Sequence, residues 1–72
     1  DYAEAFNNRS VVLRGLGRHE EALASCGRAL RIRPDYPEAL RNRGNALQGL
    51  NRHEEALACY ESAVAIQADV TG

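Results

Sequence analysis

The chain carries one pattern twice, and this repetition limits its possible folds more than any other feature. Residues 1–5 (Asp-Tyr-Ala-Glu-Ala) return as residues 35–39 (Asp-Tyr-Pro-Glu-Ala), and residues 18–24 return unchanged as residues 52–58. Every match is offset by 34 positions without a gap, as from Asp1 to Asp35. A fixed period of this length is typical of solenoids, in which each unit buries its apolar face only against a neighbour. The pattern predicts a stacked binding surface rather than an active site.

Size, charge and cysteine content narrow the class of protein. The chain has 72 residues, two of them cysteines, and a formal net charge of -1 from ten acidic and nine basic residues. This balance gives no argument for a nucleic-acid or membrane partner. No apolar run is long enough for a transmembrane span and no secretory signal is visible. The cysteines lack metal-type spacing and a disulfide framework, which predicts reduced thiols in an intracellular, cytoplasmic protein.

Apolar and small residues recur at helical spacing in two stretches of each unit. The first stretches carry Phe6, Ser10, Leu13 and Leu16, and then Leu40, Gly44, Leu47 and Leu50. The second stretches carry Ala22, Leu23, Cys26, Ala29 and Leu30, and then Ala56, Leu57, Tyr60, Ala63 and Val64. The sequence therefore predicts an all-α chain with helices at about 3–15, 19–32, 37–49 and 53–67. Short connections make neighbouring helices antiparallel.

Polar and turn residues mark the expected helix ends. Two capping boxes are predicted, in which an Asp accepts an amide hydrogen three residues on and a Glu reaches back: Asp1 with Glu4, and Asp35 with Glu38. Gly17 and Asn51 occupy equivalent places, and both residue types tolerate the left-handed conformation that ends helices. Turns are therefore expected at about 16–18 and 50–52.

The units are expected at 1–34 and 35–68, followed by the start of a truncated third unit or a tail at 69–72. Pro34 ends the second helix of the first unit, whereas Ala68 stands at the equivalent place in the second and lets that helix continue toward Asp69. Repeat arrays normally need about three or more units and polar caps. We therefore expect a fragment of a longer array, bacterial in type because all nine basic residues are arginine, that self-associates through its uncapped faces.

The spacing of these residues resembles that of the tetratricopeptide repeat family over residues 1–68. The family's marker positions hold Phe6, Arg9, Ser10, Leu13, Ala22, Cys26, Ala29 and Pro34 in the first unit, and Leu40, Arg43, Gly44, Leu47, Ala56, Tyr60, Ala63 and Ala68 in the second. Arg9 and Arg43 depart from the expected Leu. We interpret them as arginines whose methylene stems cover apolar surface while the guanidinium reaches water.

The resemblance implies a right-handed superhelical solenoid whose first helices line a concave groove for an extended peptide or a partner helix. The groove positions would be Asn7, Asn8, Val11, Arg14, Arg41, Asn42, Asn45 and Gln48. Asn8 and Asn42 are equivalent, and a ladder of carboxamides can bind a peptide backbone without reading its sequence. The tetratricopeptide arms of O-linked N-acetylglucosamine transferases carry asparagines at the matching place. The resemblance therefore implies a non-catalytic protein-interaction module with a protein or peptide ligand.

Several alternatives remain open beside this interpretation. The repeats could be the substrate-recruiting arm of a larger glycosyltransferase, or a self-assembly element. Asn8 and Asn42 could also be ordinary solvated positions. Arg41 and Asn45 match part of the carboxylate clamp of chaperone-binding members, but Asn7 and Val11, their counterparts in the first unit, do not fit it.

Candidate chemistry is weak throughout the chain. His19-Glu20-Glu21 and its copy at 53–55 lack the second histidine of a helical zinc pair, because Leu23 and Leu57 stand four residues on. Cys26 falls on the packing stripe, while Cys59 is expected to be more exposed. We therefore predict no catalytic residue, no metal site and no cofactor, and hence no enzyme activity.

Overall fold

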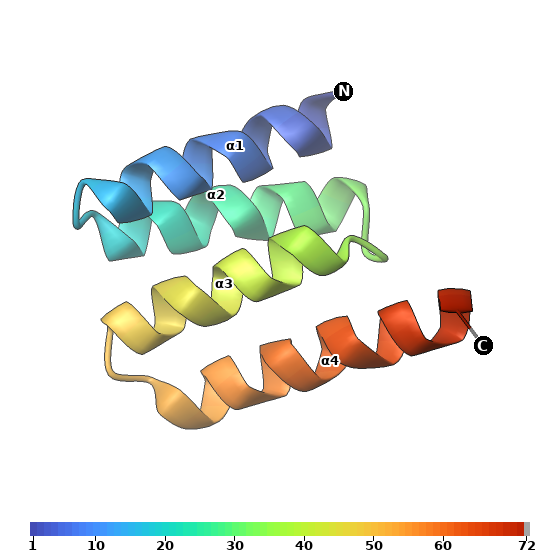
Figure 1. Cartoon of the computed structure of the whole chain (residues 1–72). Helices are drawn as coiled ribbons and strands as arrows, with labels where there is room; N and C mark the ends of the chain where they lie inside the picture. The colour runs from blue at the N-terminus through green and yellow to red at the C-terminus, as the bar shows by residue number, and fades with distance from the viewer. Residues whose placement is uncertain (72) are drawn as a thin grey trace.

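The chain forms four antiparallel helices that stack in sequence order (Figure 1). The computed structural model describes the backbone of residues 1–71 and the side chains of residues 1–68. The helices are α1 (Tyr2–Gly15), α2 (His19–Ile32), α3 (Pro37–Gly49) and α4 (His53–Thr71). The described part of the chain contains no strand. The prediction of an all-α helical solenoid is confirmed, with three helices close to their expected bounds and α4 longer than expected.

The turns within the two units have the same construction. In the first, the N–H of Arg18 donates to the carbonyl of Leu13 at 2.9 Å, and Gly17 has a φ of 78°. In the second, the N–H of Arg52 donates to the carbonyl of Leu47 at 2.8 Å, and Asn51 has a φ of 61°. This hydrogen bond provides a donor for a carbonyl that the helix end leaves without one. It also requires one residue with a positive φ in the turn. The predicted turns are therefore confirmed.

The two units differ in how their first helices begin. The Asp1 carboxylate accepts the N–H of Glu4 at 2.9 Å, as a capping residue should. The prediction that Asp35 caps the second unit is wrong, because Tyr36 occupies the N-cap of α3 and no side-chain hydrogen bond caps that helix. Pro37 supplies the reason: a proline drives the residue before it out of the helical conformation, so the helix begins one position later. Asp35 is left outside the cap.

The core consists of small side chains that let helices approach closely. One cluster gathers Ala3, Ala29, Tyr36 and Ala39, the second Leu13, Ala22 and Ala46, and the third Leu47, Ala56 and Cys59. The first two clusters join residues of both units, so the core is continuous across the boundary between them. At Gly44 an added Cβ would lie 2.7–3.0 Å from ring atoms of Tyr60. Position 44 must therefore be glycine for the Tyr60 ring of α4 to pack against α3.

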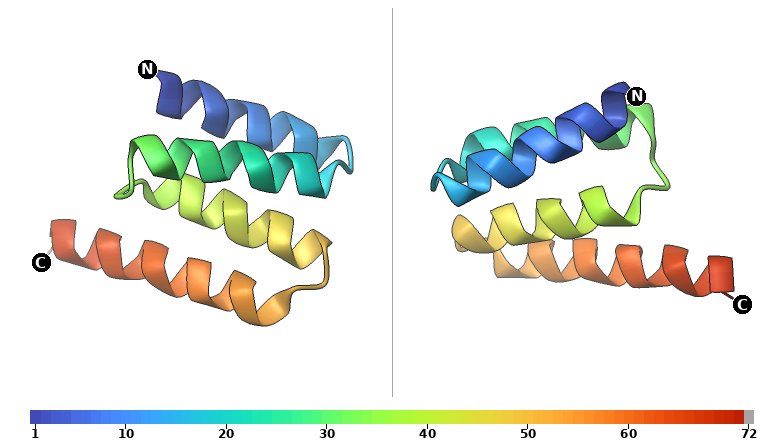
Figure 2. Two further views of the ribbon diagram at one scale, coloured as in Figure 1. Left: turned by 180° about the vertical axis from the view of Figure 1, so that it is seen from behind. Right: turned by 45° about the horizontal axis from the view of Figure 1, so that its top comes forward.

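Stacking in sequence order leaves one helix uncovered at each end. The views in Figure 2 show two antiparallel helix pairs, the second lying on the first. Consequently α1 is at one end of the stack and α4 is at the other (Figure 1). The expected third unit at 69–72 lies outside the residues whose side chains are described, and α4 continues to Thr71 there. The division into units at 34 and 68 stays a prediction.

Candidate functional site

A hydrogen-bonded asparagine pair joins the two units where α1 meets α3. The Asn42 amide donates to Asn7 Oδ1 at 2.7 Å, and the Asn7 amide donates to the Tyr36 hydroxyl at 3.4 Å. Asn7 is buried, whereas Asn42 is only half-buried. Burying a polar group without a hydrogen bond costs free energy. Here the Asn7 carboxamide avoids that cost, because its oxygen accepts from Asn42 and its amide donates to Tyr36. Asn7 is thus a positioning residue that fixes the Asn42 amide at the surface.

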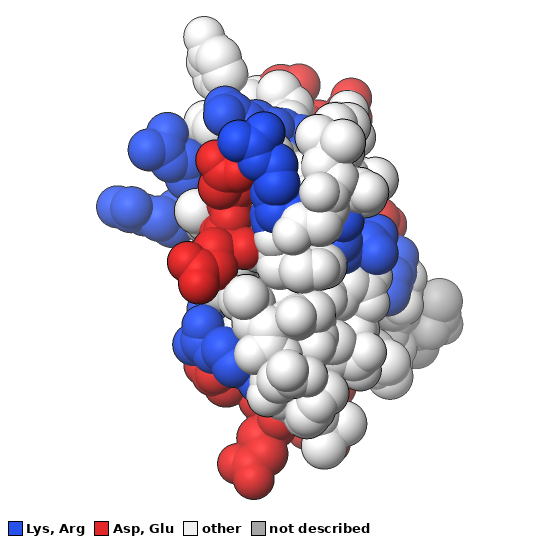
Figure 3. Space-filling view, turned by 90° about the vertical axis from the view of Figure 1, so that its left-hand side faces the viewer, with Lys and Arg blue, Asp and Glu red and all other residues white. Residues whose placement is uncertain are grey.

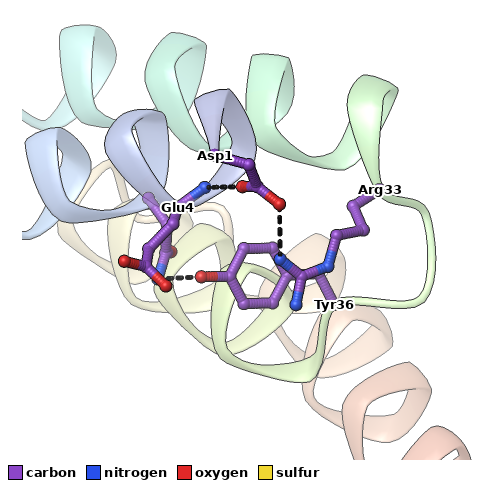
Figure 4. A network of polar contacts seen from close by, with 5 residues as sticks. Asp1, Glu4, Arg33 and Tyr36 are labelled. Carbon is purple, nitrogen blue, oxygen red and sulfur yellow. Dashed lines mark hydrogen bonds and ion pairs between the residues drawn. The ribbon is translucent and has the colours of Figure 1, made fainter.

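The Tyr36 ring is held from its other side by Arg33 (Figure 4). The Arg33 guanidinium carbon lies 4.2 Å from the ring centroid, and its Nη1 lies 3.4 Å from the Asp1 carboxylate. The ion pair is exposed and contributes little alone. Together with the cation–π contact it orders the loop between α2 and α3 against the start of α1. No functional role is predicted for Tyr36 from the sequence, and the signal that marks it is its repetition as Tyr2 at the start of the other unit.

The remaining predicted groove residues differ in their exposure and contacts. Asn8, Val11 and Gln48 are exposed, and Arg14, Arg41 and Asn45 are half-buried. Asn45 does not point freely into a groove, because its Oδ1 accepts the Tyr60 hydroxyl at 2.5 Å. Arg14 retains a buried Nε with no hydrogen-bond partner among the described residues. The structure therefore brings Asn7 and Asn42 together directly, and it commits Asn45 to the packing of α4.

Two hollows lie at equivalent places of the two units, one between α1 and α2 and the other between α3 and α4. A hollow of about 240 Å³ is lined by Phe6, Arg9, Leu13, Glu21, Ala24, Ser25 and Arg28, and one of about 300 Å³ by Leu40, Arg43, Leu47, Glu55, Ala58, Cys59 and Ser62. Each lining residue of the first has its copy 34 positions on in the second. Arg9 and Arg43, the departures from the family pattern, line these hollows. In the side view of Figure 3 positive and negative side chains gather on one flank.

Both cysteines are free and buried, which places them in the core rather than in a reactive site. Burial raises the pKa of the Cys26 thiol from 9.0 to about 11, and burial likewise raises the pKa of Cys59. Cys59 is the more exposed of the two, as expected, at 9% against 0% for Cys26, and it still packs in the third core cluster. Neither thiol has the lowered pKa of a nucleophile.

The raised pKa predicts a loss of stability in alkali. Between about pH 9 and pH 11 the unfolded chain releases the Cys26 proton while the folded chain keeps it. The folded state therefore binds more protons, and the free energy of unfolding falls as pH rises, by at most about 1.4 kcal/mol per pH unit. Urea unfolding of the wild type and of Cys26→Ala at pH 8, 9, 10 and 11 measures the difference. Parallel pH dependence in the two proteins would show that Cys26 makes no contribution.

The described residues offer neither a metal site nor a membrane span. No group of three or more His, Cys, Asp or Glu residues within residues 1–68 is placed to hold a metal ion. None of the described helices combines the length and apolar character needed to cross a bilayer. His19 packs its ring against Gly49 of α3, and its Nδ1 has no hydrogen-bond partner within the described part of the chain. This histidine serves the contact between the units.

Comparison with known proteins agrees with this architecture. The family model described as tetratricopeptide repeat matches residues 1–69. The chain belongs to the tetratricopeptide repeat family. The crystal structure of MamA is similar to this chain, with a TM-score of 0.91 and 23% sequence identity, over 97% of this chain and 41% of the MamA chain. At this identity the likeness shows the fold alone. No curated protein sequence matches the chain.

The tetratricopeptide repeat fold identifies the general kind of function. Repeats of this family are protein–protein interaction modules and are generally non-catalytic. The helical pairs of this chain have the family's arrangement, since each unit packs two antiparallel helices and the second unit stacks on the first. The chain spans 41% of the MamA chain, so it corresponds to part of that protein's length.

Proposed function

We propose that this tetratricopeptide repeat chain binds an extended peptide along the surface that α1 and α3 share. The observation that carries the proposal is the fixed Asn42 amide. One N–H of Asn42 is used in the bond to Asn7 Oδ1, at 2.7 Å. A carboxamide has two N–H donors and an oxygen with two acceptor sites, so Asn42 keeps one donor and its Oδ1 for a ligand. That combination matches one peptide unit of an extended backbone, which offers both a carbonyl and an N–H.

The fixed geometry of Asn42 favours binding. A flexible side chain loses rotamer freedom when it binds, at a cost of about 0.5–1.5 kcal/mol. Asn7 has already restricted the Asn42 amide, because it accepts from it and is itself held by the Tyr36 hydroxyl. Asn8 provides a second, exposed carboxamide in the first unit. Two equivalent amides one repeat apart would contact successive parts of one peptide, with little dependence on its sequence.

Replacing Asn42 with alanine is expected to weaken peptide binding about 2- to 12-fold, the equivalent of one hydrogen bond of about 0.5–1.5 kcal/mol. Asn8→Ala is expected to do the same, and the double variant to lose close to the product of the two factors. The probe is a peptide selected from a random-sequence display library on the wild-type chain, and its affinity is measured by fluorescence anisotropy.

Ser62→Ala is the matched control, since Ser62 is exposed on α4 and lines the hollow between α3 and α4. It should bind the same peptide with wild-type affinity. Unchanged affinity in both asparagine variants, or equal loss in the control, would contradict groove binding. The alternative of a substrate-recruiting arm of a glycosyltransferase rests on this same asparagine pair and has no separate support in the described residues.

A cytoplasmic location forms part of the proposal. It is supported by the two cysteines, which are unpaired and buried in different core positions. Free thiols persist in the reducing environment of the cytoplasm, whereas secreted small domains generally convert cysteines into disulfides.

Assembly through the open ends of the stack is a second candidate function. Large apolar side chains are exposed on both end helices: Tyr2 and Val12 on α1, and Leu57 and Val64 on α4. Exposed apolar residues on a repeat unit are the surface that a neighbouring unit normally covers. We therefore propose that copies of the chain associate, and an increase of the mean mass with concentration in light scattering is the expected result.

A further inference from the structure

The face of α3 that packs on the first unit recurs, uncovered, on α1. The inner contact consists of Tyr36, Ala39, Asn42, Ala46 and Gly49, and its copies on α1 are Tyr2, Ala5, Asn8, Val12 and Gly15. We call this set on α1 the leading face. Tyr36 is 6% exposed and Ala46 0%, whereas their copies Tyr2 and Val12 are 80% and 62% exposed. The leading face thus repeats a surface that packs on a neighbouring unit, and among the described residues this copy is exposed.

The residues of the first unit that form the other side of the inner contact also have copies in the second unit, and these copies are exposed. Asn7, His19, Leu23 and Leu30 of the first unit contact α3, and their copies in the second unit are Arg41, His53, Leu57 and Val64. We call these copies the trailing face. Leu57 is 57% exposed and Val64 is 64% exposed. The described residues therefore include an exposed copy of each half of the inner contact.

We propose that a second copy of this chain docks head to tail, its leading face on the trailing face of the first. This inference rests on the proposed assembly function and specifies its geometry. Docking would repeat the inner contact residue by residue: Val12 would meet Leu57 as Ala46 meets Leu23, and Gly15 would meet His53 as Gly49 meets His19. Gly15 has nothing within 4 Å of an added Cβ, so space for a histidine ring remains beside it.

The docked contact would differ from the inner contact in one polar residue, and its donors and acceptors would still match. Asn7, which accepts from Asn42 and donates to Tyr36, is replaced on the trailing face by Arg41. A guanidinium donates only, and it carries five N–H groups. The groups that would face it, the Tyr2 hydroxyl oxygen and the Asn8 Oδ1, can both accept. Arg41 has one exposed partner, Glu38, at 3.7 Å, which leaves further N–H donors for the docked copy.

Head-to-tail docking uses two different faces, so the contact does not close on itself. Contacts of this kind produce open filaments unless the rotation closes a ring. Each added copy would continue the stack in the same direction and leave the same two faces at the ends. Wild-type chains should therefore show a mass that increases with concentration without stopping at a dimer.

Two variants that each block one face test the arrangement. Val12→Glu puts a charge on the leading face and Leu57→Glu puts one on the trailing face, and both positions are exposed, so each variant should fold. Each alone is expected to associate at least tenfold more weakly than the wild type, because docking would bury an unpaired carboxylate. Mixed in equal amounts, they should form a 1:1 heterodimer that grows no further, as measured by analytical ultracentrifugation.

Ile32→Glu is the matched control. It introduces the same charge on α2, at a position that is 52% exposed and lies outside both faces, and it should associate like the wild type. Arg41→Asn gives the trailing face the asparagine that Asn7 provides in the inner contact. This variant should associate at least as well as the wild type. A wild type that associates while the mixture of variants stays monomeric would overturn the head-to-tail geometry and leave assembly intact. A wild type that stays monomeric at millimolar concentration would overturn both.

Discussion

Replacing Leu47 with alanine is expected to remove a large part of the stability of the fold. Leu47 is 2% exposed and is among the largest fully buried side chains in the described residues. Cutting a buried leucine to alanine costs about 2–5 kcal/mol, because apolar contacts are lost and a cavity remains. A domain of 72 residues has a total stability of roughly 4–11 kcal/mol at about 0.05–0.15 kcal/mol per residue. Urea unfolding followed by circular dichroism measures the loss.

An exposed leucine at the end of α1 provides the control. Leu16→Ala removes the same atoms from a side chain that is largely in solvent. Its effect is expected to stay within about 0.5 kcal/mol. Similar losses in the two variants would mean that the third core cluster does not hold α3 against α4, contrary to the packing of Leu47 with Ala56 and Cys59.

Replacing Gly49 with alanine is expected to destabilise the contact between the units by about 1–3 kcal/mol. The added Cβ would lie 2.4–2.6 Å from three atoms of the His19 ring, including Cγ at its base. The ring cannot clear the methyl group by rotating its tip alone, so the whole His19 side chain or the two helices must shift. This cost exceeds the gain in helix propensity, which is at most about 1 kcal/mol.

Gly15→Ala is the same change at the equivalent position of the first unit, where an added Cβ meets nothing within 4 Å. It is expected to leave stability unchanged or to raise it by up to about 1 kcal/mol. Adding His19→Ala to the Gly49→Ala variant should recover part of the lost stability, since the clash is removed. Equal effects of the two glycine variants in thermal unfolding would contradict the close contact.

The period of the sequence was sufficient to predict the helices and turns, because their determinants are local. Gly17 and Asn51 are equivalent in the repeat, and both adopt the left-handed conformation that their residue types permit. The cap at Asp35 failed for an equally local reason, since the unit carries Pro37 where the first carries Ala3. Comparing the two units position by position shows this substitution, and a proline at this place moves the start of the helix by one residue.

The candidate site was less predictable, because it depends on partners distant in sequence. Asn7 and Asn42 both carry carboxamides suited to a groove, yet Asn7 is buried and positions Asn42. Asn45 was assigned to the groove as well, and its oxygen is bonded to Tyr60 on the next helix. The direction of a polar side chain within a helix face is decided by the neighbouring helix, which the sequence of one helix does not describe.

The position of the Asn7–Asn42 hydrogen bond has a consequence for how ligand and scaffold influence each other. The bond crosses from one unit to the other, at 2.7 Å, and also orients the amide that we assign to the ligand. A peptide held by Asn42 therefore binds the stacked arrangement better than a separated one, and by reciprocity the bound peptide resists bending of one unit against the other. The curvature of the solenoid and its affinity for the peptide would then change together, because both depend on the equilibrium between stacked and separated units.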